Sequence, residues 1–567
     1  FIFENRTMGP EIAYQFAIGK RVISTSGQPA QLKRPLDFVA LTDHAEYLGV
    51  FSAISTSPDE IGHRGFLRDA VLATNVGSRW SRYLEAGEFQ KARGEFIQNS
   101  SSDPDEDARL PQDVRESIWS EVTRLADEYN EPGFFTTFIG YEWTSMVDGN
   151  NFHRVVIYAD DAPQASMMAP FSAMDSRDAT DLWKSLELYE SISGGRVLAI
   201  PHNSNLSNGR MFPDGETPDL VSREYIALSH RWEPLMEVTQ VKGDSETHPL
   251  LSPNDIFANF ERWDAGNILA TEEKTEDMLE REYARSVLGL GLKLAGRYGV
   301  NPFQFGLIGS TDSHTALATA DSDNYFGKFP NSEPVMGRAD VMLAGRWSNA
   351  TLSSSGYVAV WAKENTREAL FDALLRKEVY ASTGPRIALR FFGGWNYERE
   401  DLIQSDFVQR GYLGGVPMGG ELTDRPEDVA PVFILKAARD PLGANLDRMQ
   451  VIKGWIDPEG NRREKIFDVA LSSKGRRLKG GDVLAVGNTV DPSTATYKNN
   501  IGAPELSAFW EDPEFNPKES AFYYVRVLEI PTPRWTTYDA AFFQLEAPRG
   551  SPLTVQQRAY SSPIWYM

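Results

Sequence analysis

Short, nearly continuous runs of apolar residues recur through the first 385 positions, and each run ends in Gly, Pro or a cluster of polar residues. Runs of this kind are typical of strands that are buried on both faces, as in a parallel sheet or barrel. We therefore predict strands within residues 37–44, 135–142, 196–202, 235–240 and 305–310.

The segments between these runs have the spacing of helices. Over residues 113–129 apolar side chains recur every three or four positions, and Asp113 is available as an N-cap. Residues 366–376 repeat the pattern. Strands that alternate with helices indicate an α/β architecture.

The pattern changes after residue 386. Strand-like segments at 431–437, 449–456 and 522–530 follow one another through turn signals such as Asp457–Gly460, without long helices between them. This is an all-β pattern, most simply a sandwich. We predict two domains, an α/β domain over residues 1–385 and a β-sandwich-like domain over residues 386–567.

Composition narrows the classes of function. The net charge of -23 argues against nucleic acid and anionic membrane surfaces, since both need a basic face. No apolar run approaches the roughly 18 residues that a membrane-spanning helix needs, so we expect no membrane insertion. An anionic substrate would need local positive charge, from Arg and Lys side chains or from bound cations. The sequence does not predict the oligomeric state.

The chain contains no cysteine, which excludes disulfides, thiolate metal sites and a cysteine nucleophile. The absence of thiols fits an exported bacterial protein, so we expect a periplasmic or secreted location. The chain begins at Phe1 instead of Met, as expected of a processed or trimmed product.

Four of the seven histidines lie at the ends or beginnings of predicted strands, and two acidic residues share this placement. They are His44, His153, His202, His314, Glu142 and Asp312. In a parallel barrel the carboxyl ends of all strands open onto one face, so these residues are expected to converge there. Imidazoles and carboxylates without thiolates suit Zn, Mn or Fe. The alternative for any one histidine is an ordinary loop or core residue.

Several motifs resemble those of the PHP (polymerase and histidinol phosphatase) metallohydrolase superfamily. They include Leu41-Thr42-Asp43-His44, Ile200-Pro201-His202 and Gly309-Ser310-Thr311-Asp312-Ser313-His314. Over its full length the chain is most similar to a large bacterial family of exported PHP-like proteins of mostly unassigned function. The segments Gly140–Ser145, Asn151–Arg154, Pro201–Asn205, Gln240–Glu246 and Tyr560–Tyr566 carry that similarity.

The resemblance implies a distorted (β/α)7 barrel that holds two or three divalent metal ions. Glu142 would bridge two ions, with His153 and His202 completing one site and Asp312 the other. His44 and His314 would belong to a third site. PHP enzymes begin with a His-x-His strand that is absent upstream of His44, so we expect a dozen or more residues to precede this sequence in the native protein.

Four further residues are candidates for contact with the substrate. Lys242 and His248 lie in a dense polar run after a predicted strand, where Lys242 would touch substrate and His248 would donate a proton. Arg154 and Arg210 are candidates for binding the leaving oxyanion. The alternatives are a solvated loop for the first pair and surface salt bridges for the arginines.

The predicted activity is hydrolysis of a small anionic phosphate or sulfate ester by a metal-bridging hydroxide, with Glu142 between the ions. One alternative keeps the metals but cleaves an amide or a lactone. Another is a non-catalytic protein that binds a polysaccharide or a partner on a degenerate barrel. The sequence has no Gly-x-Ser-x-Gly, phosphate-loop or dinucleotide fingerprint that would favour other chemistry.

Overall fold

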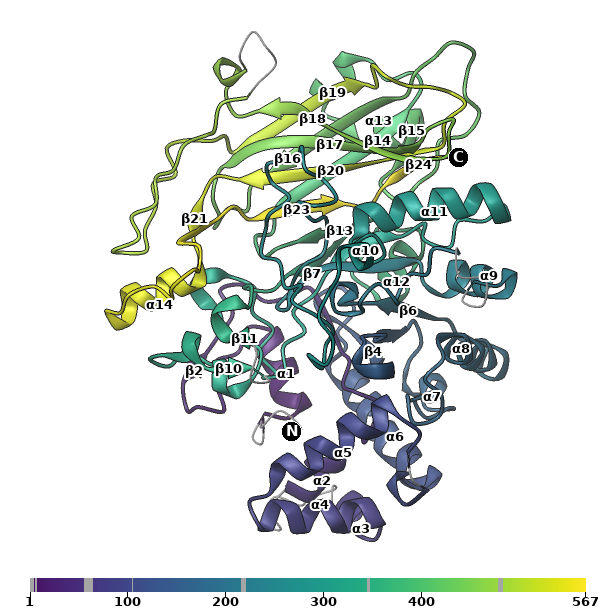
Figure 1. The fold of residues 1–567 in the computed structure, drawn as a ribbon, viewed down its shortest axis with the longest axis vertical. Coiled ribbons are helices and arrows are strands. Elements are labelled where there is room, and N and C mark those ends of the chain that lie inside the picture. Colours follow the sequence, from purple (N-terminus) through teal and green to yellow (C-terminus); the bar gives the residue numbers. More distant parts are fainter. Residues whose placement is uncertain are drawn as a thin grey trace.

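The computed structural model describes residues 5, 8–55, 65–104, 106–215, 221–343, 347–477 and 483–567. The protein is a mixed α/β structure. Two antiparallel sheets built mainly from the C-terminal part of the chain lie together at one end, and helices gather at the other (Figure 1). None of the helices in these ranges is both long and apolar enough to span a membrane.

A four-stranded sheet carries the first predicted strands. Its order is β3 (Phe38–Leu41), β4 (Thr136–Trp143), β5 (Arg154–Tyr158) and β6 (Val197–Pro201). The pair β3–β4 is parallel, whereas β5 runs antiparallel to both β4 and β6. The expectation of an all-parallel arrangement is therefore wrong at β5. The connection between β4 and β5 is too short for the crossover that a parallel pair requires.

A three-stranded sheet lies next along the chain. In it β7 (Leu235–Gln240) pairs in parallel with β9 (Gly306–Gly309) and antiparallel with β8 (Gly243–Asp244). Leu198 of β6, Leu235 of β7 and Ile308 of β9 pack in one hydrophobic cluster with helix α12 (Arg367–Leu375). The two sheets thus share a core, but no sheet within the described ranges closes into a barrel.

Two antiparallel sheets form the other end of the molecule. The larger has the order β12 (Tyr357–Val360), β13 (Val379–Ser382), β23 (Arg558–Ser561), β20 (Ala521–Glu529), β17 (Leu446–Ile456) and β18 (Arg462–Leu471), with β24 (Ile564–Tyr566) also on β20. The smaller has the order β15 (Gly415–Pro417), β14 (Ala388–Gly394), β16 (Val432–Ala438) and β19 (Glu505–Glu511). Side chains of both sheets pack in one cluster. The larger sheet joins strands from both sides of residue 386.

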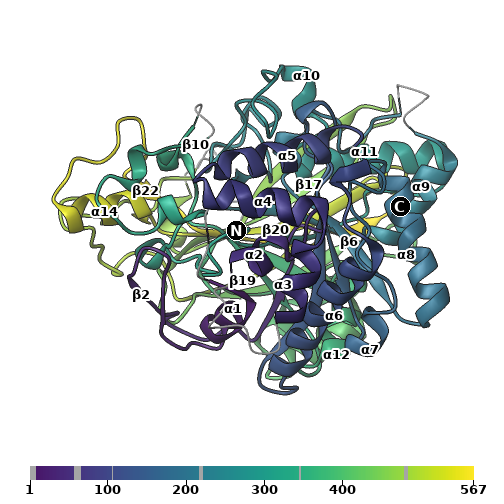
Figure 2. The ribbon, with the colours of Figure 1, turned by 90° about the horizontal axis from the view of Figure 1, so that it is seen from below.

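The helices confirm the sequence periodicity. Helix α6 (Gln112–Tyr129) and α12 match the two predicted segments, but Asp113 is not an N-cap because α6 already begins at Gln112. In α12 the Thr366 hydroxyl caps the helix by accepting from the Ala369 amide at 3.3 Å. Helices α2 to α5 pack with the start of α6 around a second core, which includes Trp80. Figure 2 shows α2 to α5 on the face seen from below.

The remaining elements complete the fold. The helices are α1 (Pro10–Ala17), α2 (Val50–Ser55), α3 (Gly65–Leu72), α4 (Asn75–Glu85), α5 (Phe89–Ser101), α7 (Ala162–Ala165), α8 (Ala179–Ser193), α9 (Arg223–Trp232), α10 (Glu276–Leu279), α11 (Ala284–Tyr298), α13 (Phe407–Gly414) and α14 (Trp535–Phe543). The short strand pairs are β1 (Val22–Ile23) with β2 (Pro29–Ala30), β10 (Met342–Leu343) with β11 (Trp347–Ser348), and β21 (Thr532–Pro533) with β22 (Thr554–Val555).

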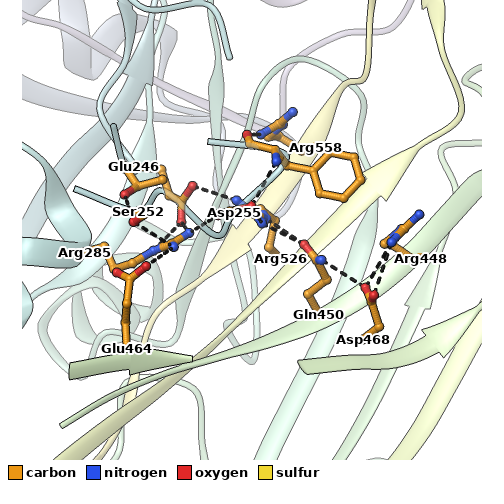
Figure 3. A network of polar contacts seen from close by, with 12 residues as sticks. Glu246, Ser252, Asp255, Arg285, Arg448, Gln450, Glu464, Asp468, Arg526 and Arg558 are labelled. Carbon is orange, nitrogen blue, oxygen red and sulfur yellow. Dashed lines mark hydrogen bonds and ion pairs between the residues drawn. The ribbon is translucent and has the colours of Figure 1, made fainter. Parts of the chain in front are cut away.

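A buried ionic network joins the segment after β8 to the larger sheet (Figure 3). Asp255 accepts from Arg285 of α11 and from Arg526 of β20, each at 2.8 Å. Glu246 pairs with the same two arginines, and the Gln450 side chain accepts from Arg526 at 3.0 Å. The four charged side chains are almost wholly removed from solvent. The network fixes the chain just beyond Lys242 against the sheet.

Asp244 is buried at the edge of this network. Its carboxylate accepts from the Tyr560 hydroxyl at 3.1 Å and from the Glu246 amide at 3.0 Å. Burial raises the pKa of Asp244 from 3.8 to about 7, and the Arg558 guanidinium only partly opposes this shift. The unfolded chain therefore ionises at this position at lower pH than the folded chain.

We expect this difference to make the stability depend on pH. A raised carboxyl pKa stabilises the fold fully below pH 3.8, and that contribution is lost as the pH rises through about 7. Relative to Asp244→Asn, the wild-type free energy of unfolding should fall by up to about 4 kcal/mol between pH 4 and 7. Urea midpoints across this range measure it, with the exposed Asp113→Asn as control. A constant wild-type-to-Asp244→Asn difference would contradict the assignment.

Candidate metal centre

The antiparallel direction of β5 brings three predicted ligands to one edge of the sheet. Glu142 lies at the end of β4, His153 directly precedes β5, and His202 directly follows β6. Because β5 runs opposite to its neighbours, its beginning lies beside their ends. Glu142 Oε1 is 2.7 Å from His153 Nδ1 and 3.2 Å from His202 Nε2.

These three side chains, called the Glu142 group below, fit a divalent metal ion. One donor atom from each of Glu142, His153 and His202 lies within 4.8 Å of the others, and all three residues are buried. No other group of three or more such side chains meets this criterion in the part of the chain that the structure describes. His153 Nε2 and His202 Nδ1 are buried without a hydrogen-bond partner there, which is costly unless something binds them. Two imidazoles and a carboxylate suit zinc, manganese or iron.

The pKa shifts of Glu142 and His153 favour the protonation states that bind a metal, whereas the shift of His202 opposes it. Burial alone would raise the pKa of Glu142, but His44 and His202 outweigh it and hold the pKa well below its ordinary value. Burial lowers the pKa of His153 to about 4. Glu142 overcomes burial at His202 and raises its pKa, so a metal that binds His202 competes with a proton.

His44 extends the centre from β3. It follows that strand and forms an isolated parallel bridge with Glu142 in the backbone. Its Nδ1 is 3.4 Å from Glu142 Oε2 and 2.7 Å from the Thr144 hydroxyl. The ring of His314 lies 5.6 Å from that of His44, centroid to centroid. All six predicted metal ligands therefore lie around one region, although they do not form a single cluster.

Asp312 is surrounded by lysines instead of by the imidazoles of the Glu142 group. Its Oδ2 is 2.7 Å from Lys242 Nζ and 2.8 Å from Lys328 Nζ. His314 Nδ1 lies 3.6 Å from Asp312 Oδ1 and 3.1 Å from Lys328 Nζ. Burial would raise the pKa of Asp312, but the two lysines hold it well below its ordinary value. Burial lowers the pKa of Lys328 to about 7, although Asp312 opposes the shift.

Three of the other candidates have partners outside this centre. Arg154 is buried, pairs with Glu233 at 2.9 Å and donates to the Phe152 carbonyl at 2.6 Å. Successive residues of a strand face opposite sides, and Val155 faces the central cavity while Arg154 packs over Trp143 on the helical side. Arg210 forms an exposed pair with Asp148.

His248 is also engaged within its own loop. Its Nε2 lies 2.9 Å from Asp264 Oδ2, and its Nδ1 accepts from the Leu250 amide at 3.1 Å. The Arg262 guanidinium lies beside the same Asp264 carboxylate, at 2.8 Å. The structure gives His248 no contact with the Glu142 group, so we leave it out of the centre, together with Arg154 and Arg210.

Sequence reasoning missed two buried ionisable residues of this region. Glu237 accepts from the Ser310 hydroxyl, and Lys328 holds the Asp312 segment. A carboxylate within the apolar run of β7 was a usable signal for Glu237, because a buried acid needs a partner. Lys328 lies outside any strand or helix, and nothing in its local pattern distinguishes it from a surface lysine.

A cavity of about 950 Å³ opens beside the centre. Its wall is largely apolar and comes from helices such as α6 and α12 and from strands β3, β4, β5, β9 and β12, including Phe38, Phe138, Ile157, Ile308 and Val358. Glu142, His202, Asp312 and His314 also line it. A molecule bound in this cavity would therefore contact apolar side chains as well as these polar groups.

Fold and site together define a mixed α/β protein with a buried carboxylate–imidazole group that could hold a metal ion. The chain belongs to the family described as "Protein of unknown function (DUF3604)", which matches residues 1–567. No curated protein and no solved structure matches the chain.

Proposed function

We propose that this protein is a metal-dependent hydrolase that cleaves phosphate or sulfate esters. The observation that carries the proposal is the convergence of Glu142, His153 and His202, with buried imidazole nitrogens that lack partners among the described residues. A structural role for these groups would pair those nitrogens within the protein. A divalent ion bound there would act as a Lewis acid on the ester and lower the pKa of water.

Side chains in and around the Glu142 group supply the metal ligands and the positive charge that binding of an anionic ester requires. Glu142 keeps its charge and His153 stays neutral, so both can act as ligands near neutral pH. Lys242 places positive charge beside the group in a chain whose net charge is -23, and Lys328, with its pKa lowered to about 7, adds positive charge below that pH. Buried positive charge of this kind favours a negatively charged substrate over a neutral ester, amide or lactone.

We also propose that the sheets around the cavity are parts of a distorted PHP-like barrel and that the two large sheets form a sandwich. The first part is supported by the hydrophobic cluster that β4, β6, β7 and β9 share with α12. The second is supported by the cluster between the two large sheets.

Metal removal and substrate choice test the proposed function together. The full chain would be stripped with a chelator, reloaded with zinc, manganese or iron(II), and assayed on aryl phosphates, phosphodiesters, aryl sulfates, carboxylic esters and lactones. We expect turnover of a phosphate or sulfate ester that is lost on stripping and restored by at least one ion. Turnover confined to neutral esters or lactones would contradict the substrate class. A chain that binds no metal and turns over nothing would be a binding protein.

A further inference from the structure

One oxygen of the Asp312 carboxylate, Oδ2, has little capacity left for a metal ion. This oxygen lies 2.7 Å from Lys242 Nζ and 2.8 Å from Lys328 Nζ, and it accepts from Gln240 Nε2 at 2.7 Å. A carboxylate oxygen offers about two lone-pair positions, so three donors saturate it. An ion at this oxygen would have to displace the amino groups of two buried lysines.

The two lysines differ in how many hydrogen-bond acceptors contact their Nζ atoms. Lys328 Nζ has three acceptors, which are Asp312 O at 2.8 Å, Asp312 Oδ2 and His314 Nδ1 at 3.1 Å. All its protons are therefore engaged, and it is a positioning residue for the loop after β9. Lys242 Nζ has Asp312 as its one partner within the described residues.

The N–H groups of Lys242 that have no acceptor among the described residues lie near the Glu142 group. Lys242 is 7% exposed, and its partner Asp312 lines the same cavity as Glu142 and His202. A buried ammonium with two unused N–H groups is costly unless a ligand accepts them. The ligand that would satisfy them carries oxygen atoms with negative charge.

We propose that Lys242 is the second cation of the centre: it supplies the positive charge that a second metal would supply and holds a non-bridging oxygen of the phosphate or sulfate group. This inference rests on the proposed function. It predicts one divalent ion per chain, bound by Glu142, His153 and His202, instead of the two or three implied by the PHP resemblance. An ammonium and a divalent ion sharing Asp312 would repel each other strongly in a buried site.

The test measures metal content and anion binding of the full chain. Elemental analysis of the wild type should give one zinc, manganese or iron ion per chain. Calorimetric titration with inorganic phosphate and sulfate should show binding at least about 10-fold weaker in Lys242→Met, with metal content unchanged. Lys242→Arg should restore most of the affinity. The exposed Lys184→Met is the matched control and should bind like the wild type.

Two results would overturn the inference. One is a wild-type protein with two or more ions per chain, and the other is a Lys242→Met variant that binds both anions as tightly as the wild type. If Lys242→Met does not fold, the wild-type ion count and the Lys242→Arg affinity decide. Failure of the proposed function has a different signature, namely no ion in the wild type and no turnover of any ester.

Discussion

Replacing Glu142 by Gln is expected to remove the metal ion and to lower kcat/KM by about 1000-fold or more. Glu142 contacts His44, His153 and His202, so its loss removes the anionic ligand around which the imidazoles are arranged. Glutamine has nearly the same volume, and the fold should be retained. Elemental analysis, kinetics and circular dichroism of the variant check the three parts of this expectation.

The matched control is Glu187→Gln, on the exposed face of α8. It should keep wild-type metal content and turnover, because it changes the same chemical group far from the strand ends. A Glu142→Gln protein with a full complement of metal and normal turnover would refute the assignment of Glu142 as a ligand.

The second large effect is expected on stability. Replacing Arg285 by Met should lower the free energy of unfolding by about 3–5 kcal/mol, because it leaves Glu246 and Asp255 buried with less compensating charge. Arg285 also donates to the Tyr524 hydroxyl at 2.8 Å, so the loss extends into β20. Urea unfolding monitored by tryptophan fluorescence measures the change.

Arg231→Met provides the comparison, since Arg231 forms an exposed pair with Glu190 at 2.8 Å. We expect a change below about 1 kcal/mol there. Similar, small effects for both variants would show that the buried network does not carry the stability that its geometry indicates.

The sequence predicted the positions of most strands around the centre but not all their directions. The strands β3, β4, β6 and β9 overlap the predicted apolar runs. The direction of β5 depends on how its connections pack, which hydrophobicity does not encode. A usable signal was the connection of about ten residues between Trp143 and Arg154, which is too short for a crossover helix.

The sequence predicted which residues lie around the candidate centre better than it predicted which of them contact one another. His153 was included because it begins a strand, and the antiparallel direction of β5 is what brings it to Glu142. Two lysines contact Asp312, which is not part of the Glu142 group, and one of them, Lys328, comes from a loop without any periodic pattern. Such contacts arise from tertiary packing, and local sequence does not specify them.

The hydrogen bonds between β13 and β23 impose an order on folding during synthesis. Residues 379–382 leave the ribosome roughly 180 residues before their partners at 558–561. At about 5–20 residues per second this delay lasts on the order of 10–35 s. For that time the nascent chain presents a bare strand edge that can pair with the wrong neighbour, so the last part of the polypeptide protects the first from aggregation.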